Sequence, residues 1–284
     1  LLTSAEAEAL VGLVGAPLAA GSVTPGRCDL APGELRRVLR RIGLYDLDTG
    51  NILDSLVADY GDLAIHAASI EEATTPIRDA VSASVARHAL TLLIGGNNAV
   101  TRPGVHGLGL PLERVGLITL DAHLDMRSTS GGLGNGNPVR ALLEDGLPGA
   151  NIAQVGLAPF ANSQVMHQDA LAAGNLVIGA ATVHASGIAR AMERALLHVQ
   201  HCETVYVDCD IDVIDRSQFP GAPGARPGGL NARDFFLATR RLAAEPRVKV
   251  MDLTEWDPPL DPTDLSVLTA GRWLAEALAG FEER

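Results

Sequence analysis

Apolar and polar residues alternate along the chain in blocks that predict strands and helices in turn. Short apolar runs bounded by turn residues are typical of strands buried on both faces; they cover residues 90–94, 115–121, 151–157, 176–178, 204–212 and 248–253. Helical spacing of apolar residues predicts helices over residues 32–39, 69–88, 136–144, 164–173, 186–201, 231–244 and 264–279. Residues 10–17 favour a strand because of their Val and Gly content and the Pro that ends them, whereas residues 45–62 are polar and turn-rich and give no assignment.

This alternation predicts one class of fold. Strands and helices that follow one another at this spacing form βαβ units, which build a parallel sheet with helices on both faces, an α/β architecture of three layers. No linker, repeat or low-complexity segment interrupts the order, so we expect a single domain over residues 1–284. In open parallel sheets, ligands bind beyond the carboxyl ends of the strands, so polar residues at those ends are the candidates for chemistry.

Composition excludes several other classes of protein. The chain is 47% hydrophobic and 20% charged, which is typical of a globular protein and not of a disordered one. Its net charge of −12 argues against nucleic acid or an anionic membrane as a partner. No apolar run reaches the ~18 residues that span a bilayer, and the first residues lack the basic flank of a signal peptide. The three cysteines form no CxxC pair, so we expect a reducing, cytoplasmic location, with Cys209 as a small buried filler.

The strongest candidate for chemistry is the sequence Asp-Ala-His-Leu-Asp at residues 121–125. It follows the apolar run 115–120 directly, so Asp121, His123 and Asp125 should emerge at the carboxyl end of a buried strand. Two carboxylates and an imidazole within five residues are typical metal ligands, and this combination is specific when it follows such a strand.

Two further strand ends carry acidic residues. Asp208 and Asp210 are two residues apart and share one face of a strand, where two carboxylates repel unless a cation or a shared proton lies between them. A divalent cation is the simplest explanation, while a shared-proton pair or an exposed strand edge stays open; Asp212 and Asp215 are expected to complete the following turn. Glu255 follows another strand, where it would meet a cationic substrate or remain solvated.

Together these residues predict a metal centre. Four carboxylates and one imidazole suit a hard to borderline ion such as Mn²⁺ better than Zn²⁺ held by thiolates. Five ligands are many for one ion, so two ions that share bridging carboxylates are expected. Such pairs lie ~3.5–4 Å apart and activate water as hydroxide near neutral pH.

At this point the chain resembles the ureohydrolase family, which comprises arginases, agmatinases, guanidinobutyrases and formimidoylglutamases. The resemblance covers most of the chain and rests on specific motifs at residues 15–17, 121–125, 208–212, 228–230 and Glu255. It implies a three-layer α/β/α fold around a mostly parallel eight-stranded sheet, a binuclear manganese site, and hydrolysis of a guanidino or formimino C–N bond.

The resemblance also implies roles for individual residues. Asp121 and Asp208 would bridge both ions, His123 and Asp210 would complete one ion, and Asp125 would bind the other. Asp125 would further take a proton from the bridging water and deliver it to the leaving amine. The acidic residue that orients the guanidinium would be Glu255.

Two departures from the family pattern bear on the substrate. Asn98 stands where the family has a histidine ligand, so one ion should bind weakly, and Asn135 lies near the position of the arginase proton-shuttle histidine. Both losses should impair metal binding and proton transfer in the hydrolysis of an ordinary guanidinium. An N-hydroxylated guanidine is less basic, and its hydroxyl oxygen can itself approach a metal ion. We therefore hypothesise manganese-dependent hydrolysis of Nω-hydroxy-L-arginine to hydroxyurea and L-ornithine by a metal-activated hydroxide, as in the family members that act in D-cycloserine antibiotic biosynthesis.

Other readings remain open from the sequence. An arginase, guanidinobutyrase or agmatinase that tolerates Asn98 is the nearest alternative, and a non-catalytic scaffold that kept the fold is a more distant one. Arg127 and Ser130 are candidates for holding a substrate carboxylate, and Asn135 and Asn162 are further candidate substrate contacts. Oligomeric state is left open, and the only expected partner is a small guanidino substrate.

Overall fold

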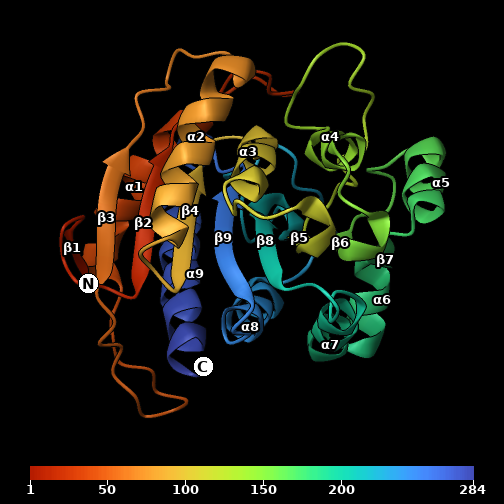
Figure 1. The fold of residues 1–284 in the computed structure, drawn as a ribbon. Coiled ribbons are helices and arrows are strands. Elements are labelled where there is room, and N and C mark those ends of the chain that lie inside the picture. The colour runs from red at the N-terminus through yellow and green to blue at the C-terminus, as the bar shows by residue number, and fades with distance from the viewer.

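The computed structural model describes residues 1–284 and contains one nine-stranded, wholly parallel sheet (Figure 1). The strand order across the sheet is β1-β3-β2-β4-β9-β8-β5-β6-β7. The strands are β1 (Leu2–Ser4), β2 (Val11–Ala16), β3 (Val57–Asp62), β4 (Leu90–Gly95), β5 (Val115–Leu120), β6 (Ile152–Leu157), β7 (Leu176–Gly179), β8 (Thr204–Asp210) and β9 (Val248–Thr254).

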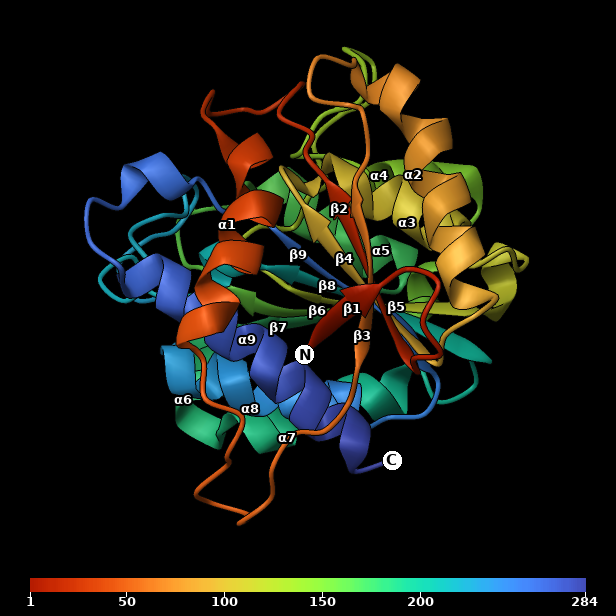
Figure 2. The ribbon, with the colours of Figure 1, turned by 90° about the vertical axis from the view of Figure 1, so that its left-hand side faces the viewer.

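Helices cover both faces of this sheet, as Figure 2 shows in a view turned by 90°. One face packs against α2 (Ile70–Val85), α3 (Thr101–His106), α4 (Pro138–Asp145) and α5 (Gln164–Ala173). The other face packs against α1 (Ala31–Val38), α6 (Ala180–Ser186), α7 (Ile188–His198), α8 (Ala232–Ala243) and α9 (Leu265–Glu282). The expected three-layer α/β/α class is therefore confirmed.

The structure differs from the sequence-based expectation in four elements. The sheet has nine strands instead of eight, because the short edge strand β1 and the strand β3, in a segment that we could not assign, both join it. The short helix α3 was also not foreseen. The helix expected over residues 186–201 is α7, which covers Ile188–His198, and the preceding helix α6 was not predicted. Gly187, with a φ of +86°, separates α6 from α7.

Local signals explain where several helices begin. Ser69 and Glu72 form a reciprocal capping box at the start of α2, and the Asn231 side chain accepts a hydrogen bond from the Asp234 amide at the start of α8. The strands β2, β4, β5, β6 and β8 are buried along their whole length, as expected for a parallel sheet covered on both sides.

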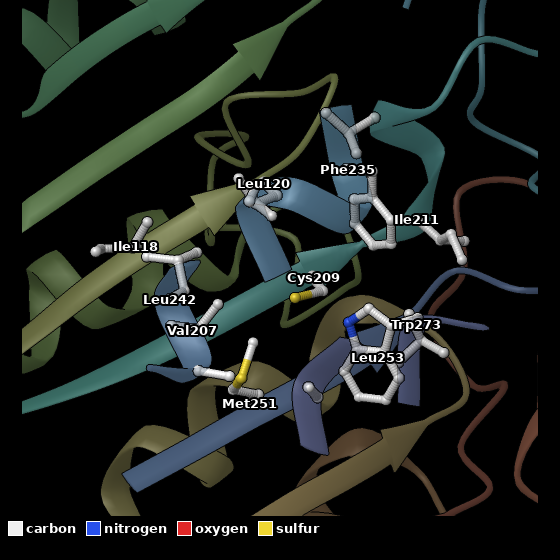
Figure 3. Close-up of a cluster of buried hydrophobic side chains, with 14 of the residues drawn as sticks. Ile118, Leu120, Val207, Cys209, Ile211, Phe235, Leu242, Met251, Leu253 and Trp273 are labelled. Carbon is white, nitrogen blue, oxygen red and sulfur yellow. The ribbon is translucent and has the colours of Figure 1, made fainter. Parts of the chain in front are cut away.

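The larger core cluster lies between the sheet and the helices α8 and α9 (Figure 3). Cys209 points from β8 into this cluster, among Leu120, Leu253 and Trp273. Burial raises the pKa of its thiol well above the ordinary value, so Cys209 stays a neutral thiol. This placement confirms its role as a buried filler. None of the helices is both long and apolar enough to cross a lipid bilayer.

Candidate metal centre and active site

The four strand ends that carry polar residues in the sequence lie side by side in the sheet. The strands β4, β9, β8 and β5 are consecutive in the strand order, although they lie far apart along the chain. Their carboxyl ends bring together Asn98, Glu255, Asp210 and Asp121 at one edge of the sheet. The candidate site is thus assembled by strand order rather than by closeness in sequence.

The register between neighbouring strands decides which aspartates lie level with one another. Thr119 pairs with Asp208 and Leu120 pairs with Cys209, so Asp121 at the end of β5 lies level with Asp210 at the end of β8. Asp208 lies level with Thr119 on one side and with Asp252 on the other. The Asp208 side chain is therefore one layer, or about 6.6 Å of strand, below the edge of the sheet.

We call the side chains at the carboxyl edge of the sheet the outer layer. The contacts of the His123 imidazole show which carboxylates belong to it. Its Nδ1 lies 3.0 Å from Asp212 Oδ2 and 3.5 Å from Asp121 Oδ1, and these three residues form a group with metal-ligand spacing. Asp212, which we expected only to complete a turn, thus faces the site. The reason is that β8 ends at Asp210 and a 3₁₀ turn begins at Ile211, so the alternation of strand side chains no longer applies.

Asp208, which we expected to bridge two ions, does not line the cavity described below and lies deeper in the sheet than His123 and Asp212. It lies beside Asp252, whose carboxylate accepts hydrogen bonds from Tyr206 Oη at 2.7 Å, Thr101 Oγ1 at 2.8 Å and the Cys209 amide at 3.0 Å. Burial, and next the charge of Asp252, raise the pKa of Asp208 well above its ordinary value, which favours a shared proton between these two carboxyl groups.

Asn98 and Asp125 form a second hydrogen-bonded group in the site. The Asn98 Nδ2 donates to Asp125 Oδ2 at 2.7 Å and to Asp208 Oδ2 at 3.4 Å, and its Oδ1 accepts from Thr254 Oγ1 at 3.2 Å. The Thr101 hydroxyl lies 2.6 Å from Asn98 Oδ1 and 2.8 Å from Asp252 Oδ2, so its one proton serves either acceptor. Asp125 is buried and has a left-handed φ of +52°, which is uncommon for a residue other than glycine. Such strained residues cluster at functional sites.

Glu255 is the second strained acidic residue, with a φ of +59°. Its Oε1 accepts hydrogen bonds from the backbone N–H of Asn98 at 2.7 Å and from the side-chain Nδ2 of Asn135 at 2.9 Å. The Oδ1 of Asn135 in turn accepts a hydrogen bond from the backbone N–H of Val23. Burial raises the pKa of Glu255 to about 7. Asn135 therefore joins Glu255 to the loop before α1, and Glu255 also lines the cavity described below.

The carboxylates of the outer layer repel one another when they are ionised, and a bound cation would stabilise their charged form. Burial raises the pKa of Asp121 to about 7 and raises those of Asp125 and Asp210 well above their ordinary values, with repulsion from neighbouring carboxylates adding to the effect. Burial opposes a charge on His123, but the carboxylates of Asp212 and Asp121 outweigh it and raise the imidazole pKa to about 11. Asp121 Oδ2 is also buried without a hydrogen-bond partner. These carboxylates and one imidazole fit a hard to borderline cation.

A cavity of about 260 Å³ opens above this layer. One wall is the loop over residues 221–229, in which a Cβ on Gly224 would lie 2.0 Å from Asp212 Oδ2 and 3.0 Å from His123 Cε1, so only glycine fits. The other lining groups include His123, Asp125, Arg127, Asn135, Asn162, Asp210, Asp212, Arg226 and Glu255.

Four of the five expected substrate contacts line this cavity, and Glu255 is one of them. Arg127 and Asn135 do so, whereas Ser130 is outside it and bonds to Ser128. Asn162 also lines the cavity, but its amide accepts from the Leu124 amide at 2.7 Å and donates to Ala122 at 3.0 Å. Asn162 thus holds the 121–125 segment in place. Asp212 and Arg226 are cavity residues that the sequence did not reveal.

Comparison with known proteins identifies the family. The family model described as Arginase family matches residues 9–280. Formimidoylglutamase of Bacillus subtilis is 29% identical over 276 residues, which cover 95% of this chain and 86% of that protein. Guanidinobutyrase of Pseudomonas aeruginosa is 29% identical over 96% of this chain and 87% of that protein. The chain belongs to the arginase family.

Solved structures agree with this assignment. The crystal structure of the Bacillus subtilis formimidoylglutamase superposes with a TM-score of 0.93 at 28% identity, over 99% of this chain and 90% of that one. Formiminoglutamase of Trypanosoma cruzi with two Mn²⁺ superposes with a TM-score of 0.91 at 25% identity, over 98% and 96% of the two chains.

Proposed function

We propose that this chain is a manganese-dependent amidinohydrolase that cleaves N-formimidoyl-L-glutamate to L-glutamate and formamide. The observation that carries the proposal is the polarity of one cavity, whose inner end is a cluster of buried carboxylates and whose outer part holds the arginine Arg127. A substrate with a cationic amidine at one end and carboxylates at the other fits this polarity. The similarity to formimidoylglutamases over 95% of the chain supports the same substrate.

The proposed metal ligands follow from the strand register. Asp121 and Asp210 lie level on neighbouring strands and are the carboxylates that two ions would share. His123 and Asp212 would complete one ion, because they contact each other beside Asp121. Asp125 would bind the second ion. Asn98 turns its amide nitrogen toward Asp125 and its oxygen toward Thr101 and Thr254, so it would be at most a weak ligand, after its amide has turned over. When bound, the manganese pair supplies an activated water as the nucleophile.

The protein groups around the substrate have separate roles in this proposal. Glu255 binds the amidinium through its free carboxylate oxygen, while Asn98 and Asn135 hold the other oxygen. This contact places the formimidoyl carbon above the buried carboxylates. Asp125 accepts a proton from the attacking water and delivers it to the nitrogen of the leaving amine, so that the C–N bond breaks with L-glutamate as the leaving group.

Asn98 is consistent with this substrate on chemical grounds. In an amidinium the positive charge is shared by two nitrogens and the carbon carries only hydrogen, whereas a guanidinium carbon is stabilised by three nitrogens. The formimidoyl carbon is therefore the better electrophile. Its hydrolysis needs a less strongly activated nucleophile, which a site with one weak metal ligand can still supply.

The second candidate substrate is Nω-hydroxy-L-arginine, which the same weak ligand favours because the hydroxyl lowers the basicity of the guanidine. The similarity to a guanidinobutyrase adds 4-guanidinobutyrate to the compounds to be compared. A parallel assay of the purified protein with Mn²⁺ separates these substrates by their products, formamide, hydroxyurea and urea. We expect kcat/KM for N-formimidoyl-L-glutamate to exceed that for every guanidino compound by at least tenfold. Equal or faster release of hydroxyurea would assign the chain to hydroxyarginine instead.

A further inference from the structure

We infer that Arg226 forms a second carboxylate subsite, which selects a substrate with an anionic side chain as well as an α-carboxylate. This inference rests on the proposed function and deepens it. Arg226 lies on the 221–229 loop, and its side chain lines the same cavity as Arg127. The resemblance to known enzymes did not suggest this residue, and no motif in the sequence marks it.

The surroundings of Arg226 leave its guanidinium available for a ligand. Its Nη1 donates to the carbonyl oxygens of Gly224 at 2.7 Å and Ala225 at 3.2 Å. These bonds fix one nitrogen, while Nε and Nη2 keep the parallel donor geometry that binds a carboxylate in bidentate fashion. Neither Arg226 nor Arg127 forms an ion pair with a carboxylate of the chain, although the protein carries a net charge of −12.

The loop that carries Arg226 is packed against the proposed metal ligands. Gly224 packs directly against Asp212 and His123, and Asp215 anchors the far side of the loop by accepting a hydrogen bond from the Gly228 amide. Arg127 is exposed and follows the buried Asp125 by two residues, so it belongs to the part of the cavity wall that the segment after Asp125 forms. Two separate walls thus present one arginine each, which matches the two carboxylates of a glutamate derivative.

Arg216 offers a matched control. It lies on the turn that precedes the same loop, and its Nη1 donates to the carbonyl oxygens of Ala222 at 2.9 Å and Pro223 at 3.1 Å. Arg216 therefore supports the loop in the same way as Arg226, but it does not line the cavity. A purely structural role of Arg226 predicts similar consequences for Arg226→Gln and Arg216→Gln.

The experiment compares N-formimidoyl-L-glutamate with N-formimidoyl-L-glutamine, in which a neutral amide replaces the side-chain carboxylate. We expect wild-type protein to prefer the glutamate compound, and Arg226→Gln to reduce the ratio of the two kcat/KM values at least tenfold, mainly through KM. Arg216→Gln should leave this ratio within twofold, and Arg127→Gln should slow both substrates alike. An unchanged ratio in Arg226→Gln would overturn the inference.

Binding of non-reacting acids keeps the subsite testable apart from turnover. Calorimetry of the Mn²⁺-loaded protein should show that glutarate binds more tightly than butyrate, and that Arg226→Gln removes this difference. If wild-type protein hydrolyses no formimidoyl compound but keeps the glutarate preference, the proposed function fails and the subsite stands. If turnover is observed and neither the ratio nor the glutarate preference depends on Arg226, the proposed function stands and the subsite fails.

Discussion

Replacing Asp212 and Asp208 separately by asparagine tests the register argument for the metal centre. The two substitutions are chemically identical, and both residues are buried, at 2% and 0% exposure. Asp212 Oδ2 lies 3.0 Å from His123 Nδ1, whereas Asp208 lies one layer lower, beside Asp252. The change at Asp212 should therefore remove a metal ligand, and the change at Asp208 should not.

The expected magnitudes differ enough to be measured. Loss of a residue that merely supports a metal ligand costs about 10–100-fold in affinity, so loss of Asp212 should weaken Mn²⁺ binding by at least about 100-fold, or ~2.7 kcal/mol. Asp208→Asn should keep Mn²⁺ affinity within about fivefold, and its amide can donate to Asp252 in place of the shared proton, so stability to denaturant should not fall.

Isothermal titration with Mn²⁺ and urea unfolding of both variants provide the measurements. Circular dichroism of the metal-free variants serves as the control for folding. If Asp208→Asn abolished Mn²⁺ binding while Asp212→Asn kept it, the assignment of layers from strand register would be wrong.

Three further predictions concern the same centre. Asn98→His should tighten the weaker manganese position about tenfold in calorimetry, and an unchanged isotherm would mean that residue 98 does not approach the ion. Gly224→Ala should weaken Mn²⁺ binding by at least tenfold, because its Cβ would lie 2.0 Å from Asp212 Oδ2, whereas Gly33→Ala, which meets nothing within 4 Å, should have no such effect. Because the folded-state pKa of Asp121 is raised from 3.8 to about 7, folding favours its protonated form, and the Tm of chelator-treated protein should fall as the pH rises from 5 to 8. Added Mn²⁺ should restore Tm more strongly at pH 8 than at pH 5, and a Tm that rises with pH without metal would contradict this sign.

The local pattern of the sequence was sufficient for most of the architecture. Strands buried on both faces are apolar throughout, and amphipathic helices repeat with their own period, so the order of elements and the α/β class followed directly. It also marked Asp121, His123 and Asp125 as candidate ligands, because these residues follow a strand within a single short segment, and the structure places His123 and Asp125 on the cavity wall. The local pattern missed β1, which is only three residues long, and β3, whose residues 57–62 include two aspartates and a glycine and so lack an apolar run. It also missed the short helix α6.

Only the tertiary structure decided which aspartates of residues 208–212 face the site. Alternation along a strand groups Asp208 with Asp210, but it does not say how far a strand extends before its neighbour ends. That information lies in the pairing of β8 with β5 and β9, which places Asp210 beside Asp121 and Asp208 beside Asp252. The role of Asp212 likewise depends on the 3₁₀ turn that follows β8, and the position of Arg226 depends on a loop folded back over the sheet. Contacts between segments far apart in sequence set all of these positions, so no local pattern of residues could reveal them.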